Sequence, residues 1–321
     1  MAVYTDIADD ELDRLLGCYD IGQAVACTGI AEGVENSNFM LLTDRDRYIL
    51  TLYEKRVDPA DLPFFLGLLD HLSERGFPCP RPVRTRAGET LVTAADRPAA
   101  IVSFLQGRWP RKPRPVHLAA IGDALAQLHL AAGDFPLRRP NALSLDGWST
   151  LIRQSESGAD TVLPGLSGEL WREMAAIRTD WPRDLPTGVI HADLFPDNVF
   201  FMGDELSGVI DFYFACNDIL LYDLAICLNA WCFERDGAFN ITHARAMLQA
   251  YRNRRPISRA EFDALPLLAR GAALRFLATR LYDWLHTPEG AFVTRKDPLE
   301  YWHKLKFHRG VADTRAYGLD F

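Results

Sequence analysis

The sequence contains no long apolar run and no excess of positive charge. None of its segments approaches the roughly 18 consecutive apolar residues of a membrane-spanning helix. Lysine and arginine number 35 against 43 aspartate and glutamate residues, which gives a net charge of −8. A basic surface of the kind that binds nucleic acid is therefore missing at the level of the whole chain. We expect neither a membrane nor a nucleic acid as a partner.

The sequence also has no paired cysteine motif and no secretory leader. Its six cysteines form no C-x-x-C pair and mostly lie among apolar residues, a pattern typical of buried free thiols in a reducing compartment. The opening segment, MAVYTDIADDELDRLLGCYD, is acidic and lacks the basic stretch and apolar core of a signal peptide. These absences predict a cytoplasmic protein.

The N-terminal part of the chain carries strand-like patterns and one clear helix. Residues 38–43 and 47–54 alternate apolar and polar side chains, which predicts two half-buried strands joined by the turn DRDR. Residues 58–76 predict a helix, and 77–107 predict two more strands around the turn at 86–90. A small antiparallel sheet with one principal helix follows from these patterns.

The pattern changes after this region. From 116–133 onward, helical patterns dominate the chain. A length of 321 residues, 48% of them hydrophobic, suits about two structural units. We therefore predict an α+β fold of two lobes, with residues 1–106 as a small β-sheet lobe and 107–321 as a larger, mainly helical lobe. A cleft between two such lobes is a common place for a ligand.

The densest polar chemistry lies in the segment HADLFPDN and in the short apolar strand GVID that follows it. His191, Asp193 and Asn198 fit the spacing H-x-D-x-x-x-x-N, and Asp211 closes the strand. Phosphoryl transfer needs an aspartate near the acceptor hydroxyl and hard oxygen ligands for Mg²⁺, which an amide and a carboxylate can supply. A hairpin of this form would bring Asp193, as a base, and the ligands Asn198 and Asp211 to one cleft.

Two other interpretations of this stretch stay open. Aspartate and asparagine after a strand commonly form turns that have no catalytic role. Alternatively, a hydrolytic metal centre could use His191, Asp193, Asp197 and Asp211 as ligands, although the sequence supplies no further histidine at a recognisable spacing. The complete motif, placed after a β-rich region, favours phosphoryl transfer over both.

The segments HADLFPDNV and GVIDF resemble the catalytic segment of the aminoglycoside-phosphotransferase-like kinases, which are relatives of the protein kinases. The resemblance extends over nearly the whole chain. It implies a protein-kinase-like fold that uses ATP and Mg²⁺, with Asp193 as the catalytic base and His191 in a structural role. Asp223, in YDLA, resembles the helix-borne aspartate that braces the catalytic loop in this family.

The same resemblance places the ATP phosphates beside the segment GIAEGVENSNF. This segment is neither a G-x-G-x-x-G loop nor a Walker A motif, but its glycines permit a tight turn and its polar side chains offer hydrogen-bond donors. The residues implied in phosphate binding are Gly29, Gly33, Asn36, Ser37 and Asn38. The segment IVSFLQG resembles the linker between the lobes, where the backbone near Ser103 and Leu105 would hold adenine.

One pair of positions departs from the family pattern. The family places a lysine in the third strand and pairs it with a glutamate on the next helix, whereas Thr51 and Phe65 stand at those positions here. Loss of both partners avoids one unpaired buried charge. Lys55, shortly downstream, could contact the phosphates in place of that lysine. A nucleotide-binding protein without catalytic activity is therefore a further alternative.

The chain also resembles the branch of this family that phosphorylates the side-chain hydroxyl of L-homoserine, in the strings GVENSNF, ILTLYEKR, DFYFACND, LNAWCFE, GAALRFLATRLYDWL and KDPLEYWHKLKFHR. Such a zwitterion needs a cation for its carboxylate and an acidic group for its ammonium. In the predicted helix 272–286, Arg275 and Tyr282 lie beside the apolar stripe and are the candidate substrate residues. A choline-like or aminoglycoside acceptor is the alternative within the same class.

Overall fold

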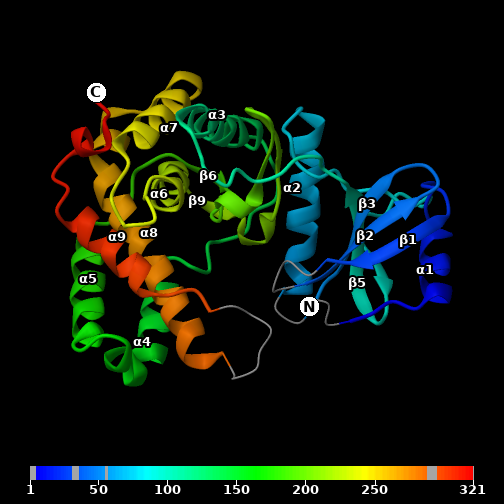
Figure 1. Ribbon diagram of the computed structural model, residues 1–321, viewed down its shortest axis with the longest axis horizontal. Coiled ribbons are helices and arrows are strands. Elements are labelled where there is room, and N and C mark those ends of the chain that lie inside the picture. The colour runs from blue at the N-terminus through cyan, green and yellow to red at the C-terminus, as the bar shows by residue number, and fades with distance from the viewer. Residues whose placement is uncertain (1–4, 31–35, 55–56, 288–294, 321) are drawn as a thin grey trace.

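The computed structural model describes residues 5–30, 36–54, 57–287 and 295–320. A β-sheet flanked by one helix lies on one side of the molecule and most of the helices lie on the other, with helix α2 between them (Figure 1). The predicted α+β class is confirmed. We call the part up to the end of the sheet the sheet lobe and the part from helix α3 onward the helical lobe.

The sheet lobe contains a five-stranded antiparallel sheet in the order β1-β2-β3-β5-β4. Its elements are α1 (Asp9–Leu16), β1 (Ala24–Gly29), β2 (Ser37–Thr43), β3 (Arg47–Leu52), the 3₁₀ helix η1 (Pro59–Asp61), α2 (Leu62–Glu74), β4 (Val92–Ala94) and β5 (Arg97–Ser103). Alternate residues of β2 are buried, and Phe39 and Leu41 pack in one apolar cluster with Leu12 and Leu16 of α1. The period-two pattern of the sequence therefore places one face of the sheet against α1.

The turn between β4 and β5 differs from the prediction. A turn does form at 85–89, but β4 begins only at Val92, and its hairpin with β5 turns at Ala95 and Asp96. These two residues have φ angles of +49° and +55°. Two-residue hairpin turns need positive φ, which glycine or asparagine usually supplies. The alanine gave no such signal, so the sequence pattern pointed to the wrong turn.

Helix α2 begins and ends as the sequence pattern suggests. The Asp58 carboxylate accepts a hydrogen bond from Ala60 N (2.9 Å) at the start of η1, which leads directly into α2. At the other end Gly76 has a φ of +72°, which glycine adopts without strain. The buried face of α2, with Phe65 and Leu68, belongs to the apolar core of the helical lobe and not to the core under α1. The helical lobe therefore fixes α2, and the division at residues 106 and 107 stays a prediction.

The helical lobe contains two small two-stranded sheets, β6–β9 and β7–β8, among its helices. Its elements are α3 (Pro115–Ala131), α4 (Leu145–Val162), α5 (Leu166–Asp180), β6 (Thr187–Ile190), η2 (Pro196–Asn198), β7 (Val199–Met202), β8 (Glu205–Val209), η3 (Phe212–Phe214), β9 (Cys216–Ile219), α6 (Leu220–Trp231), α7 (Ile241–Arg254), α8 (Arg259–His286), α9 (Leu299–Arg309) and η4 (Thr314–Tyr317). Helix α8 is buried over 271–278 and packs against α4, α5, α6 and α9. Among the described residues, no helix combines the length and apolar character needed to cross a bilayer.

Candidate active site

The predicted catalytic residues lie on the two connections that join the β6–β9 pair to the β7–β8 pair. Strand β6 pairs with β9 and β7 pairs with β8, so that the loop 191–198 leaves β6 and Asp211 follows β8. Ala192 and Asp211 have φ angles of +63° and +64°. Positive φ is uncommon outside glycine and persists where surrounding contacts hold a functional turn. Both turns are held in this way.

Asp223, in the first turn of α6, holds the catalytic loop through its backbone. Its carboxylate accepts the N–H groups of His191 (2.6 Å) and Ala192 (2.9 Å), and His129 Nε2 lies 3.2 Å away. Burial alone would raise the pKa of Asp223, but the contacts from His129 and His191 outweigh it and hold the pKa below its ordinary value. A charged, fully buried carboxylate thus fixes the backbone immediately before Asp193.

The His191 ring joins the catalytic loop to the residue before Asp211. Its Nε2 donates to Ile210 O (3.0 Å), and its Nδ1 accepts from Asp193 N (3.3 Å). Ile210 N in turn donates to Asn198 O (3.0 Å). Burial lowers the pKa of His191, which keeps the ring neutral while both of its nitrogens contact backbone groups. The ring thus links the two turns through backbone groups, and its structural role in catalysis stays a prediction.

The Asp193 carboxylate lies in a field of other charges. Asp193 itself is half-buried. Burial, followed by the charge of Asp211, raises the pKa of Asp193 to about 7, against opposing effects of Arg275 and Lys296. A carboxylate with a pKa near neutrality is well matched to general base catalysis near neutral pH.

Asn198 and Asp211 provide an all-oxygen donor pair. Asn198 Nδ2 donates to Asp193 O (2.8 Å) and lies 3.4 Å from Asp193 Oδ2, so the other end of the amide, Oδ1, is the atom that can bind a metal. An amide oxygen beside a carboxylate fits Mg²⁺. In the described part of the chain, no group of three or more His, Cys, Asp or Glu residues is arranged to hold a metal ion. That finding counts against a hydrolytic metal centre.

Of the two candidate substrate residues, both of them described, only Arg275 contacts the catalytic loop. Its residue surface is 2% exposed, and Nη1 donates to Ala192 O (2.5 Å). The guanidinium carbon lies 4.4 Å from the ring centroid of Phe276. Tyr282 lies further along α8 and stacks on His286, with 4.2 Å between the ring centroids. Both substrate assignments stay predictions, and the contacts of Arg275 also position the loop.

Several residues expected near the ATP phosphates take part in the packing of the sheet lobe. Gly33 and Lys55 lie outside the described residues, and Gly29 is the last residue of β1. The contacts of the remaining three are Ser37 Oγ to Glu54 Oε1 (2.8 Å), Glu54 N to Asn36 Oδ1 (3.2 Å) and Thr51 Oγ1 to Asn38 Oδ1 (2.8 Å). These side-chain oxygens form hydrogen bonds within the sheet lobe. Their contacts with the phosphates stay predictions.

The two expected backbone positions for adenine lie at the end of β5 and in the linker that follows it. Ser103 N donates to Arg81 O (2.8 Å), and Ser103 Oγ accepts from Arg81 N (2.9 Å). Among the described residues, no backbone group hydrogen-bonds to the N–H or C=O of Leu105. Both adenine contacts stay predictions.

Packed side chains fill the positions of the lysine and glutamate that the family pairs. Thr51 is buried in β3, where its hydroxyl donates to Asn38, and Phe65 packs edge to face on Tyr213 with 5.6 Å between the ring centroids. Tyr213 and Tyr53 also pack edge to face, and their hydroxyl oxygens are 3.4 Å apart. Both departures from the family pattern thus belong to well-packed parts of the interior.

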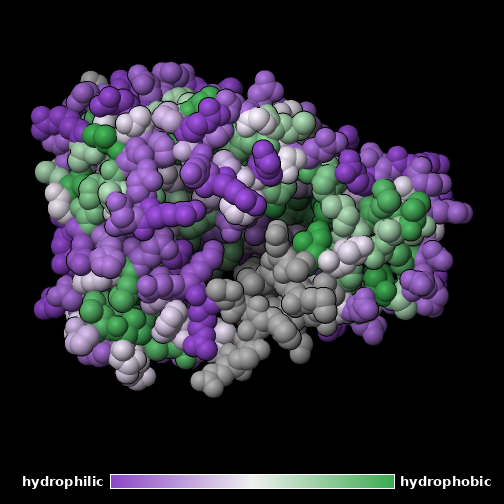
Figure 2. Space-filling model, in the orientation of Figure 1, coloured by the Kyte–Doolittle hydropathy of each residue, from purple (hydrophilic) through white to green (hydrophobic). Residues whose placement is uncertain are grey.

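A cavity of about 140 Å³ opens between α2 and the helical lobe, and Figure 2 shows the surface hollowed between the two lobes. The charged residues that line this cavity are Asp58 and Asp61 from the sheet lobe and Arg139 and Arg275 from the helical lobe. Asn141, which also lines it, donates to the carboxylate of Asp218. Arg139 and Asn141 could not be recognised from the sequence, because they lie in a loop without a motif and only their charge or polarity marks them.

Known proteins of similar sequence match this chain over nearly its whole length. A model described as a phosphotransferase enzyme family matches residues 26–257. The homoserine kinase of Rhodospirillum rubrum is 64% identical over 319 residues, which cover 99% of both chains. The homoserine kinase of Parvibaculum lavamentivorans is 63% identical over 320 residues, which cover 100% of both chains.

Solved structures with the same fold are kinases of more distant sequence. An amicoumacin kinase in complex with AMP-PNP and Ca²⁺ has a TM-score of 0.69 at 16% identity, over 93% of this chain and 92% of that one. A spectinomycin phosphotransferase in complex with ADP and spectinomycin has a TM-score of 0.66 at 14% identity, over 97% of each chain. At these identities the likeness concerns the fold alone, and it confirms the predicted two-lobed kinase-like architecture. The chain therefore belongs to the phosphotransferase enzyme family and, within it, to the homoserine kinases.

Proposed function

We propose that this chain transfers the γ-phosphoryl group of ATP to the side-chain hydroxyl of L-homoserine, with O-phospho-L-homoserine and ADP as products, in threonine biosynthesis. The observation that carries the proposal is the placement of Asp193 and Asn198 beside Asp211, in a chain whose full-length relatives are homoserine kinases. Use of ATP follows from membership of a kinase family.

Asp193 would act as the general base. As the acceptor oxygen attacks the γ-phosphorus, its O–H bond breaks and Asp193 takes the proton, while a new P–O bond forms and ADP leaves. The raised pKa of Asp193, to about 7, supports this role because the group can accept a proton near neutral pH and release it afterwards. Asp223 and His191 would keep the loop in position through the backbone contacts described above.

Asn198 and Asp211 would hold the Mg²⁺ ion. When bound, this ion would neutralise part of the negative charge of the phosphates. The contribution of the chain itself is orientation: the Asn198 amide nitrogen is fixed on Asp193, so that the ligand oxygen and the base keep one relative position. Leu105 in the linker would contact adenine through its backbone.

A protein that binds nucleotide without catalysis is the alternative from another class. The presence of Asp193, Asn198 and Asp211 together argues against it, whereas Thr51 and Phe65 at the positions of the Lys–Glu pair keep it open. A coupled assay of ADP release with ATP, Mg²⁺ and a panel of hydroxyl acceptors tests the proposal. Release with L-homoserine supports it, whereas nucleotide binding with no release for any acceptor would support the inactive protein.

We also propose that the protein works in the cytoplasm, where ATP is available and thiols stay reduced. All six cysteines lie in the described part of the chain and all six are free. Four of them are buried, namely Cys79, Cys216, Cys227 and Cys232. Free buried thiols are the ordinary state of cysteine in a reducing compartment, and detection of the protein in a soluble cell fraction together with its activity would test this location.

A further inference from the structure

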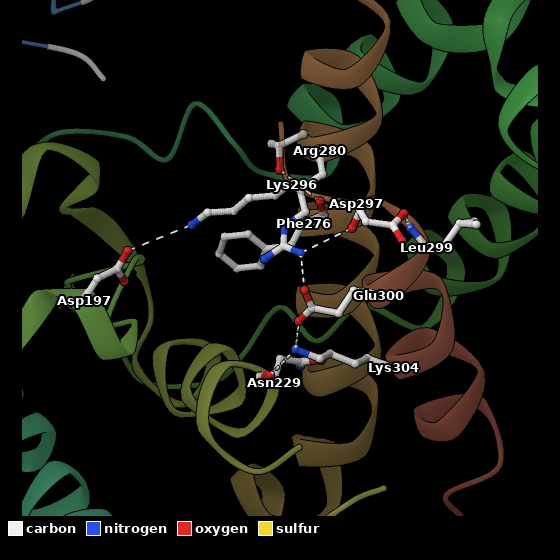
Figure 3. A network of polar contacts seen from close by, with 10 residues as sticks. Asp197, Asn229, Phe276, Arg280, Lys296, Asp297, Leu299, Glu300 and Lys304 are labelled. Carbon is white, nitrogen blue, oxygen red and sulfur yellow. Dashed lines mark hydrogen bonds and ion pairs between the residues drawn. The ribbon is translucent and has the colours of Figure 1, made fainter. Parts of the chain in front are cut away.

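Asp197 and Lys296 face each other beside the catalytic base, and neither has a role in the steps proposed above. Lys296 Nζ lies 4.0 Å from Asp197 Oδ2, and the two side chains are 61% and 63% exposed (Figure 3). An ion pair at this distance and exposure contributes little to stability. Each partner can therefore exchange the other for a ligand at small cost.

Both charges lie close enough to the catalytic base to act on its carboxylate. Asp197 belongs to the same loop as Asp193, and the charges of Asp197 and Lys296 both act on Asp193. Lys296 Nζ also lies 5.8 Å from the ring centroid of Phe195, which stands between the two aspartates in the loop. A molecule whose hydroxyl contacts Asp193 would thus have its other end beside this pair.

Helix α8 holds both sides of the pair in place. On the side of Lys296, Arg280 Nη1 donates to the carbonyl of Asp297 (3.4 Å) and to Glu300 Oε2 (2.6 Å) at the start of α9 (Figure 3). On the side of the catalytic loop, Phe276 packs edge to face on Phe195, with 4.9 Å between the ring centroids. The pair therefore rests on a rigid element, which is what a binding site for a small ligand requires.

We propose that Asp197 binds the ammonium group and Lys296 the carboxylate of the amino-acid acceptor, an inference that rests on the proposed function. The two charged groups of an α-amino acid are bonded to the same carbon and lie about 3 Å apart, by ordinary bond lengths. Such a zwitterion satisfies an Asp and a Lys that face each other at 4.0 Å. In L-homoserine the hydroxyl oxygen lies about 5 Å from the carboxylate carbon in an extended chain, so in the proposed pose the hydroxyl points toward Asp193 and the charged groups toward the pair.

The acceptors that test this assignment each lack one charged group of L-homoserine. 3-Aminopropanol has the ammonium and no carboxylate, and 4-hydroxybutyrate has the carboxylate and no ammonium. Lys296→Met is expected to raise KM for L-homoserine about 10- to 100-fold, the range for losing a hydrogen bond to a charged group, and to leave KM for 3-aminopropanol unchanged. Asp197→Asn is expected to raise KM for L-homoserine similarly and to leave KM for 4-hydroxybutyrate unchanged.

A second readout and a control variant separate this role from others. The dissociation constant of Mg²⁺–ATP, measured by calorimetry without acceptor, is expected to stay at the wild-type value in both variants. Lys306→Met removes another lysine, exposed on α9 and stacked near Trp302 (5.6 Å to the ring centroid). This control is expected to match wild type in both KM and ATP affinity.

Three results would overturn the assignment. Weaker ATP binding by Lys296→Met would make Lys296 a phosphate ligand. An equal rise in KM for all three acceptors in both variants would show that the ion pair is a structural contact. If Arg275→Leu loses the preference for L-homoserine over 3-aminopropanol and Lys296→Met keeps it, Arg275 binds the carboxylate, as the sequence predicts. Wild-type protein that phosphorylates choline and not L-homoserine would instead refute the proposed function, before any variant is made.

Discussion

Arg139 in the helical lobe donates through Nε to Asp61 Oδ2 at the entrance to α2, at a distance of 2.6 Å. The same guanidinium donates through Nη1 to Ala215 O (3.2 Å), and its carbon lies 5.0 Å from the ring centroid of Phe65. One side chain thus ties α2 to the segment that follows Asp211. Thr51 and Phe65 stand where the family pairs a lysine with a glutamate, and Arg139 instead links the start of α2 to the helical lobe.

The first prediction concerns this link between the lobes. We expect Asp61→Asn to lower the free energy of unfolding by about 1 kcal/mol, since the pair is partly exposed. Arg139→Met is expected to cost about 2–3 kcal/mol, because it also removes the contacts with Ala215 and Phe65. The double variant should be no less stable than Arg139→Met alone, because the shared interaction is lost only once. Urea denaturation of the four proteins measures this coupling, and strictly additive losses would contradict it.

The second prediction concerns the base. Asp193→Asn keeps the size and most of the packing of the side chain and removes its ability to take a proton. Turnover is expected to fall at least about a hundredfold, the lower range for loss of general base catalysis, while ATP affinity stays largely intact. Steady-state kinetics and nucleotide titration of the purified variant provide the measurement. Turnover close to that of wild type would remove Asp193 from the role of base.

The third prediction concerns the Mg²⁺ ligands. Asn198→Ala and Asp211→Ala should both weaken the use of Mg²⁺–ATP, and Asp211→Ala should be the more severe because it removes a full charge beside the metal. The concentration of Mg²⁺ at half-maximal rate is expected to rise in both variants. If the metal titration curves of both variants coincide with that of wild type, these residues do not hold the ion.

The catalytic segment was predictable because its chemistry is close together in the sequence. His191, Asp193 and Asn198 belong to one loop, and a single hairpin separates them from Asp211, so spacing alone brings them near one another. The ends of α2 were predictable for a similar reason, since the carboxylate of Asp58 and the positive φ of Gly76 are local features. The structure adds the backbone contacts that orient these groups, which no spacing can indicate.

The pairs between distant segments were not predictable. Arg139 and Asp61 are 78 positions apart, and Lys296 and Asp197 come from different parts of the helical lobe. With 35 basic and 43 acidic residues in the chain, a single sequence gives no reason to join one particular cation to one particular anion. Their partners follow from the packing of whole helices, and for that reason the proposed contacts of Asp197 and Lys296 with the acceptor could be inferred only from the structure.

The fourth prediction concerns the dependence of stability on pH. His308 is buried against Tyr317 Oη (2.7 Å) and Asn229 Oδ1 (3.2 Å), and burial lowers its pKa to about 3. The unfolded chain takes up this proton below about pH 6.5 and the folded chain does not, so stability falls as the pH falls from about 6.5 toward 3. The contribution of one such group is about 1.4 kcal/mol per pH unit.

His308→Gln removes this titration and keeps a neutral polar side chain. The variant is expected to be less stable than wild type at neutral pH, because the fit to Tyr317 is lost. Its free energy of unfolding should, however, decline less steeply as the pH falls from about 6.5 to 4. The difference between the slopes of wild type and variant is expected to be about 1.4 kcal/mol per pH unit. Chemical denaturation across this range measures both slopes. Parallel curves for the two proteins would show that His308 is not the group whose protonation is coupled to unfolding.

The last prediction concerns the acceptor. We expect L-homoserine to be phosphorylated well, and choline, kanamycin-type amines and 3-aminopropanol to be poor substrates. A site that pairs both a carboxylate and an ammonium group leaves one of its own charges unsatisfied when either is missing, so the loss in kcat/KM should be steep, about a hundredfold or more. ADP release measured for the four acceptors under one set of conditions gives the ratios directly. Rapid turnover of choline or of an aminoglycoside, with none on L-homoserine, would contradict the assignment of the acceptor. The proposed base and metal ligands would be unaffected by that result, because those residues act on the phosphoryl group and not on the amino acid.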